Sequence, residues 1–237
     1  MALPKVNDLP SYVTKLPSTG EKVKFRPFVM KEQKNLLIAL ETNDEKQIIQ
    51  SLEDIILACT DINDYSKLAT FDVEYLFIQI RTKSVGETAT ILCTCQSCMQ
   101  KTKVDVDLSK IDIEVDKDAT KKIKINDAIS IEMKYPSQQG MINNTRLMNA
   151  GTRTEELILT IIECLNKIYT EEEMFLASDS TFEELLDFID SMTTEQFNML
   201  VNFVTSLPQT MHSVEWNCEH CEKNNVYTIY GINDFFG

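Results

Sequence analysis

Apolar residues recur with helical spacing in the first third of the chain. Between residues 44 and 60 they occupy the positions i, i+1, i+4, i+7, i+8 and i+11, which lie on one face of a helix. We expect two further helices over residues 31–41 and 71–83. Residues 11–28 precede them as two short strand-like runs around the turn Pro17–Gly20, whose glycine can adopt positive φ. The pattern therefore predicts a hairpin followed by three helices.

From residue 87 onward the period changes to two, which is typical of strands with one buried face. The alternation runs through four short segments, 101–107, 111–115, 123–125 and 129–133, and residues 87–93 before them are also strand-like. Residues 137–149 have no clear period, and we expect them to be irregular. The alternation returns near the C-terminus over residues 212–216 and 226–230. These segments predict short strands on both sides of a long intervening stretch.

Helical spacing returns within that stretch at about Thr152. One apolar helical face is expected from five residues: Leu157, Ile161, Cys164, Leu165 and Ile168. Thr170, Thr181 and Thr193 are each followed three residues later by Glu or Gln, which is the pattern of a capping box at a helix N-terminus. We therefore predict that helices start at all three threonines, and that the last helix ends before Pro208.

The cysteines add a candidate metal site to this order of elements. Two C-x2-C pairs, Cys95 with Cys98 and Cys218 with Cys221, are separated by 119 residues, and each is flanked by strand-like sequence. Two thiolates in one tight turn can chelate an ion, and two such turns complete a tetrahedral zinc site without an open position for water. We therefore predict one structural zinc ion per chain, held in a zinc ribbon.

Other interpretations of the cysteines remain open at this point. The pairs could be redox motifs or plain reduced thiols, and Cys93 could replace a ligand because it shares a strand face with Cys95. Cys59 and Cys164 lie on apolar helical faces and are expected in the core. His220 lies inside the second turn and is expected to point to solvent. Seven cysteines, an odd number, argue against a disulfide framework.

Together the patterns predict an α+β fold. We expect an N-terminal hairpin and helical module over residues 1–86 and a β segment with the first cysteine pair over residues 87–135. A helical insertion is expected over residues 136–208, and a closing β hairpin with the second pair over residues 209–237. In this arrangement a zinc-ribbon-like antiparallel β module carries inserted β strands and a C-terminal helical cluster.

Composition and charge indicate which kinds of partner the protein can bind. The 237 residues carry 37 acidic against 23 basic side chains, which gives a net charge of −14. Binding to nucleic acid or to an anionic membrane requires clustered Lys and Arg, so we expect neither partner. No apolar run approaches the roughly 18 residues that span a bilayer, and the N-terminal residues lack the apolar core of a signal peptide. We expect a soluble cytoplasmic protein whose partners are other proteins.

The sequence contains no recognisable catalytic motif. Its two histidines, His212 and His220, both lie beside the second cysteine pair, and neither has a nucleophile in a known motif nearby. There is no phosphate-binding glycine loop and no H-E-x-x-H sequence. We therefore expect that the protein is not an enzyme.

Three basic residues, Arg26, Arg81 and Lys83, are candidates for a partner-binding edge. A simpler interpretation is that the two arginines pair with nearby carboxylates such as Glu32 or Asp72. Exposed ion pairs of this kind are common, and each contributes little to stability.

Several segments together resemble one protein family. They are Leu16–Gly20, Arg26–Phe28 with Glu32, Phe71–Phe77, and Arg81–Gly86 leading to Cys95 and Cys98. Over about residues 11–100 the chain resembles the T4-type bacteriophage baseplate hub assembly proteins, and a weaker resemblance continues to Cys221. The Arg-x-Lys-Ser-Val-Gly stretch followed by a cysteine pair is its most specific part.

This resemblance implies a non-enzymatic phage protein that acts in the host cytoplasm. It implies an assembly factor or chaperone that binds baseplate hub proteins while the central hub of a contractile tail forms. The alternative is a permanent structural subunit of the hub in the virion, because the family includes both kinds. A third hypothesis, a zinc-ribbon regulator associated with nucleic acid, is disfavoured by the net charge of −14.

Overall fold

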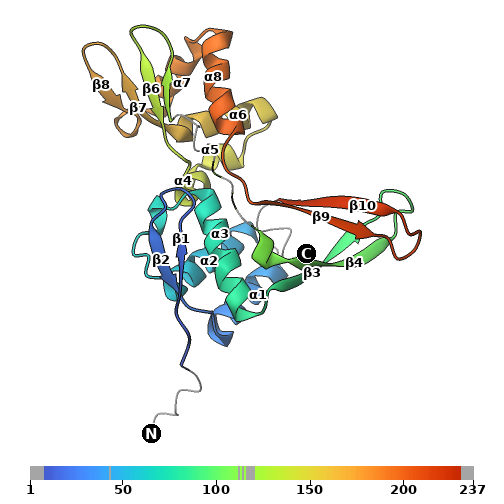
Figure 1. The fold of residues 1–237 in the computed structure, drawn as a ribbon. Coiled ribbons are helices and arrows are strands. Elements are labelled where there is room, and N and C mark those ends of the chain that lie inside the picture. The colour runs from blue at the N-terminus through green and yellow to red at the C-terminus, as the bar shows by residue number, and fades with distance from the viewer. Residues whose placement is uncertain (1–7, 43, 112, 114, 116–120, 231–237) are drawn as a thin grey trace. The chain divides into compact units, whose positions relative to one another are not determined.

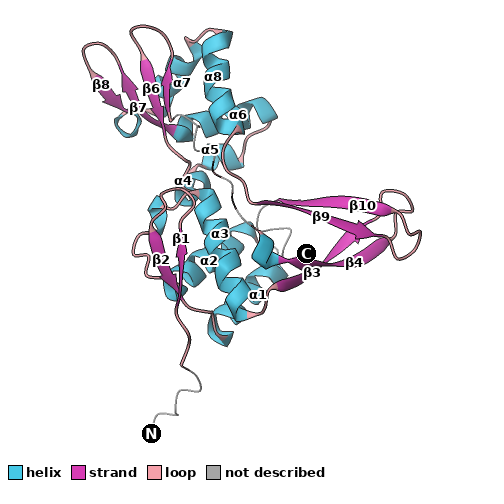
Figure 2. Ribbon diagram, in the orientation of Figure 1, coloured by secondary structure: helices cyan, strands magenta, loops and turns pink. Residues whose placement is uncertain are grey.

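The computed structural model describes residues 8–42, 44–111, 113, 115 and 121–230. The chain divides into two compact units (Figure 1): unit 1 comprises residues 1–65, 71–114 and 209–237, and unit 2 comprises residues 66–70 and 115–208. Each unit combines helices with small antiparallel sheets (Figure 2), which confirms the predicted mixture of α and β structure. None of the described helices is both long and apolar enough to cross a membrane.

Unit 1 begins with the predicted hairpin and helices. Strands β1 (Tyr12–Lys15) and β2 (Lys22–Phe25) pair antiparallel, and Gly20 in their turn has a φ of +73°. Three α-helices follow: α1 (Met30–Thr42), α2 (Glu45–Cys59) and α3 (Thr70–Ser84), with a short 3-10 turn (Tyr65–Lys67) before α3. The hairpin and all three helices are therefore confirmed.

Helix α3 lies in the core of unit 1, and hydrogen bonds connect both of its ends to residues 18–28. Its buried apolar side chains are Phe71, Val73, Leu76, Phe77, Ile78 and Ile80. Asp72, only 1% exposed in the first turn, accepts hydrogen bonds from the backbone N–H (3.0 Å) and the hydroxyl of Ser18 in the β1–β2 turn. At the other end, Ser84 Oγ accepts a hydrogen bond from the Phe28 N–H (2.9 Å). These bonds tie residues 18–28 to both ends of α3.

Two long hairpins complete unit 1. Strands β3 (Thr88–Thr94) and β4 (Lys101–Asp107) form the first, and β9 (Met211–Asn217) and β10 (Asn224–Tyr230) form the second. In β3 and β4, buried and exposed side chains alternate as the period of two predicts. One apolar cluster joins both hairpins to α3, and its main members are Ile78, Ala89, Ile91, Val104, Val106, Trp216 and Ile229.

Unit 2 contains a four-stranded antiparallel sheet with helices. The strand order is β5-β6-β7-β8, made of β5 (Lys122–Lys124), β6 (Ser130–Met133), β7 (Leu165–Tyr169) and β8 (Met174–Leu176). The helices are α4 (Gln138–Asn143), α5 (Thr145–Met148), α6 (Arg153–Cys164), α7 (Phe182–Asp190) and α8 (Thr194–Thr205). Residues of β6, α6, β7, α7 and α8 form its apolar core, which includes Ile131, Ile161, Leu165, Leu185 and Leu200.

Two of the three predicted capping boxes are present, and the third prediction is wrong. Thr181 and Thr193 cap α7 and α8 with reciprocal bonds to Glu184 and Gln196. Thr170 instead begins the turn between β7 and β8, where its hydroxyl accepts a hydrogen bond from the Glu173 N–H (3.0 Å). This bond is half of a capping box, so the same local pattern suits a hairpin turn as well as a helix start.

The boundaries of other predicted elements also differ. The apolar face assigned to one helix continues past its end, because Leu165 and Ile168 belong to strand β7. Residues 137–149, expected to be irregular, contain the short helices α4 and α5. Residues 111, 113 and 115 of the predicted strand 111–115 are not in a strand, and residues 112 and 114 lie outside the described residues. Short apolar repeats alone do not distinguish a helix from a strand or from irregular structure.

The predicted β segment over residues 87–135 contributes to both units. Strands β3 and β4 belong to unit 1, whereas β5 and β6 pair with β7 and β8 in unit 2. The segment 136–208, expected to be helical, therefore supplies two strands of its own. Alternation along a strand shows which face is buried, but it does not specify which other strand pairs with it.

Candidate metal centre

Each C-x2-C pair lies in the turn of a hairpin in unit 1. Cys95 and Cys98 lie between β3 and β4, and Cys218 and Cys221 lie between β9 and β10. Cys95 and Cys218 are buried, and the other two cysteines are half-buried. The shared apolar cluster beneath the hairpins brings together two turns that are far apart in the sequence.

The first turn has a compact hydrogen-bond pattern. The Cys95 N–H donates to the carbonyl of Gln100 (2.9 Å), and the Met99 N–H donates to the carbonyl of Cys95 (2.9 Å). Met99 has a φ of +60°, a conformation that costs L-residues about 1–2 kcal/mol. The turn between the two cysteines therefore closes tightly, at some conformational cost.

The second turn repeats this pattern position by position. The Cys218 N–H donates to the carbonyl of Lys223 (3.0 Å), and the Glu222 N–H donates to the carbonyl of Cys218 (2.9 Å). Glu222, like Met99 one residue after a second cysteine, has a φ of +58°. The two halves of the site are thus built in the same way.

The four sulfur atoms form one compact group. All of them lie within 4.8 Å of one another. The Sγ atoms of Cys95 and Cys221 are 3.7 Å apart, and those of Cys98 and Cys218 are 3.6 Å apart. Both distances far exceed the roughly 2.05 Å of a disulfide. They agree with the edge of a tetrahedron whose centre is about 2.3 Å from each sulfur, which is about 3.8 Å long.

Backbone N–H groups directed at the sulfurs favour ionised thiols at two positions. Hydrogen bonds from the N–H groups of Cys98 and Ser97 lower the pKa of the Cys95 thiol to about 6. At Cys218, burial opposes ionisation, but the N–H groups of the following turn, including that of His220, hold the pKa of the thiol below its ordinary value. The surroundings of Cys95 and Cys218 thus favour the negatively charged thiolate.

Because the four sulfurs lie so close together, ionising all four thiols without a cation is costly. The Gln100 N–H lowers the pKa of the Cys98 thiol, but burial and hydrogen bonds with the other three thiols raise it to about 12. A divalent cation at the centre removes this conflict because it attracts every thiolate. The donor set, the distances and the electrostatics therefore all fit a tetrahedral metal ion such as zinc.

A buried asparagine that the sequence analysis did not single out connects the two turns. Asn225, 8% exposed, accepts a hydrogen bond from the Gln96 N–H (3.2 Å) through its side-chain oxygen. Its amide donates to the carbonyl of Lys223 (2.8 Å). The only signal in the sequence is a polar residue where alternation along β10 would place an inward-facing side chain.

The other cysteines lie outside the group of four. Cys93 faces the apolar cluster of unit 1, and burial raises the pKa of its thiol. Burial also raises the pKa of Cys59 to about 11 and that of Cys164 to about 12. All three are buried, as expected for Cys59 and Cys164. His220 is exposed and contacts the site through its backbone N–H, which donates to Cys218 Sγ (3.4 Å).

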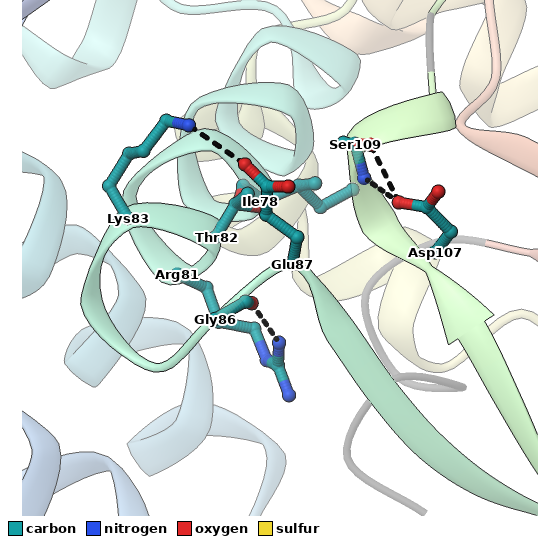
Figure 3. A network of polar contacts seen from close by, with 8 residues as sticks. All are labelled: Ile78, Arg81, Thr82, Lys83, Gly86, Glu87, Asp107 and Ser109. Atoms are coloured by element: carbon teal, nitrogen blue, oxygen red, sulfur yellow. Dashed lines mark hydrogen bonds and ion pairs between the residues drawn. The ribbon is translucent and has the colours of Figure 1, made fainter.

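The basic residues proposed as a partner-binding edge make contacts within the chain. Arg26 forms an ion pair with Glu32 (3.1 Å), as the simpler interpretation predicts. Figure 3 shows that Lys83 pairs with Glu87 (3.1 Å) and that the Arg81 guanidinium donates to the Gly86 carbonyl (3.5 Å). The contacts of Lys83 and Arg81 lie where α3 leads into β3, and that of Arg26 lies where β2 leads into α1.

Comparison with known protein families identifies the family of this chain. A family model described as T4 bacteriophage base plate protein matches residues 9–237. No curated protein and no solved structure gives a significant match. The matched range includes both cysteine turns and the described residues of both units except Asp8. Because the match covers nearly the whole chain, the protein belongs to the family of T4 bacteriophage base plate proteins.

Proposed function

We propose that Cys95, Cys98, Cys218 and Cys221 bind one structural zinc ion per chain, which makes the two hairpins a zinc ribbon. The tetrahedral spacing of the sulfurs supports this proposal most directly. When bound, zinc would supply charge neutralisation and a cross-link between the hairpin tips. Four cysteine ligands leave no position for a catalytic water, so the role of the site is structural.

The cross-link would join two parts of the chain that are far apart in the sequence. All of unit 2 outside residues 66–70 lies between the two cysteine pairs in the sequence. Closing such a long loop costs more conformational entropy than closing a short one, and the binding free energy of a metal can offset that cost. The zinc would thus stabilise unit 1 by linking its parts on either side of residues 115–208.

Replacing Asn225 by alanine is expected to weaken the site without removing a ligand. The change leaves the Gln96 N–H and the Lys223 carbonyl without this side chain, so the two turns are less firmly joined. We expect zinc affinity to fall about 10- to 100-fold, the usual effect of losing such a supporting contact. Chelator competition on purified protein measures this affinity.

The exposed neighbour Asn224 provides a matched control on the same strand. Asn224→Ala removes the same side chain from a position that faces solvent, so its zinc affinity should equal that of the wild type. Equal affinities for both variants would show that the Asn225 bridge does not support the site.

We propose further that the protein is a non-enzymatic assembly factor for the central hub of a contractile-tail baseplate. Membership of the base plate protein family is the observation that carries this proposal. The saturated cysteine site and the net charge of −14 support binding to proteins rather than catalysis or binding to nucleic acid. Its partners would be baseplate hub proteins in the host cytoplasm.

Quantitative mass spectrometry of purified virions and infected-cell lysate tests this role. An assembly factor should be abundant in the lysate and missing from finished particles. A fixed small number of copies per particle would contradict that role and favour the alternative, a permanent structural subunit of the hub. Immunoprecipitation from the same lysate would identify the hub protein that the chain binds.

A further inference from the structure

Unit 2 contains an open apolar groove of about 680 Å³. Its floor consists of buried or half-buried side chains from the sheet and from α7, which include Ile168, Leu185 and Phe188. Met174 and Phe175 of β8 also line it, although they are 49% and 45% exposed. Two large apolar side chains exposed beside an apolar groove are typical of a binding surface.

The groove lies along a free edge of the sheet. Among the described residues, β8 pairs only with β7 and is the last strand of the order β5-β6-β7-β8 (Figure 1). A strand at such an edge can offer backbone N–H and C=O groups to a second chain. The groove therefore combines apolar side chains with backbone groups available for hydrogen bonding.

The charged side chains that line the groove are all acidic. Within unit 2, residues 168–208 contain nine acidic residues and neither Lys nor Arg. Asp179 and Glu184 line the groove, and three exposed glutamates, Glu171 to Glu173, occupy the turn that begins at its lining residue Thr170. The preceding basic residue, Lys167, faces Glu132 (3.8 Å). The groove thus offers an acidic border to a ligand.

We propose that this groove binds a cationic segment of a partner protein, in which apolar residues are flanked by Lys or Arg. The apolar residues would cover Met174 and Phe175, and the basic residues would face the acidic border. Burial of apolar surface supplies the affinity, and complementary charge increases the rate of encounter. This inference does not depend on the zinc proposal or on whether the chain remains in the virion.

A partner protein fits better than a second copy of this chain. The basic strand at the opposite edge of the same sheet already makes contacts of its own. Lys121 and Lys122 lie over the rings of Tyr135 (4.0 Å) and Tyr169 (4.3 Å). Lys124 forms an ion pair 2.7 Å long. Docking this strand onto the groove of another copy would have to compete with these contacts.

Fluorescence anisotropy with two labelled peptides tests the proposal on the full-length chain as purified. One probe is a short amphipathic peptide of Leu and Lys, and the other has Glu in place of every Lys. We expect the lysine peptide to bind and the glutamate peptide not to bind. Raising the salt concentration from about 50 to about 200 mM should weaken binding several-fold, because screening reduces the charge attraction.

Variants separate binding in the groove from general attraction to an acidic protein. Phe175→Ser removes an exposed apolar side chain and should reduce affinity about tenfold. Asp179→Asn removes one border charge and should reduce affinity less. Glu41→Gln removes the same charge from an exposed position on α1 in unit 1 and should have no effect. Thermal unfolding of each variant verifies that the fold is retained.

Three results would overturn the proposal. Equal binding of both peptides would remove the role of charge, and unchanged affinity in Phe175→Ser would place the peptide elsewhere. Self-association of the wild-type chain that Phe175→Ser abolishes would identify a second copy as the occupant. Each result can be recognised whether or not the protein acts in hub assembly.

Discussion

Cys98→Ser and Cys221→Ser are expected to lose bound zinc and to unfold unit 1 at a much lower temperature. Each change removes one of four thiolates and leaves a crowded site without its full ligand set. Structural zinc sites in small domains contribute apparent binding free energies of about 10–16 kcal/mol. A loss of even about 4 kcal/mol would lower the unfolding temperature by about 8–16 °C in a chain of this size.

Metal analysis and tryptophan emission measure the two consequences separately. The wild-type chain should contain about one zinc ion and each variant much less. Trp216, the only tryptophan in the sequence, is buried in the apolar cluster beneath the site. Its emission should therefore shift to longer wavelength when a strong chelator removes zinc. A metal-free wild-type protein that keeps its full stability in chelator would contradict the zinc proposal.

Cys93→Ser and Cys164→Ser serve as matched controls because they make the same chemical change outside the group of four. Both variants should retain about one zinc ion, although each places a hydroxyl in an apolar core and loses some stability. Loss of zinc from Cys93→Ser alone would identify Cys93 as a ligand and revive that alternative.

Asp72→Ala is expected to destabilise unit 1 by about 3 kcal/mol. The Asp72 carboxylate is 1% exposed and accepts the Ser18 N–H (3.0 Å) and hydroxyl. Alanine would leave these donors without the carboxylate and would release the β1–β2 turn from α3. Chemical denaturation monitored by circular dichroism measures the loss, and Asp72→Asn should show a smaller one because its amide keeps an acceptor oxygen.

Asp61→Ala is the matched control for this prediction. Asp61 is exposed, and its carboxylate also accepts a backbone hydrogen bond, from the Lys24 N–H (2.9 Å). Removal of an exposed bond of this type should cost about 1 kcal/mol or less. Similar losses for both variants would show that the buried contact of Asp72 has no special role.

The segments that carry the family resemblance have structural roles within unit 1. Ser18 and Asp72 join the first hairpin to α3, and Phe28 and Ser84 make a second connection. Gly86, with a φ of +129°, allows the chain to leave α3 and enter β3. These residues of the resemblance therefore make contacts that join separate elements of unit 1.

The sequence alone determined the features that depend on neighbouring residues. Helical spacing predicted α1, α2 and α3, and alternation predicted β3, β4, β9 and β10, because each element buries one face. The two C-x2-C pairs predicted that the cysteines lie in two tight turns, since two residues between cysteines suffice for such a turn. Local patterns could not distinguish the turn at Thr170 from a helix start, because both use the same hydrogen bond.

Features that depend on distant residues are visible only in the folded chain. The pairing of β6 with β7, the contact of Ser18 with Asp72 and the bridge from Asn225 to Gln96 each join segments separated by tens of residues or more. No periodicity encodes such pairs, because they arise when separate elements bury their apolar faces together. The same packing places four cysteine sulfurs within 4.8 Å and leaves an apolar groove open on unit 2.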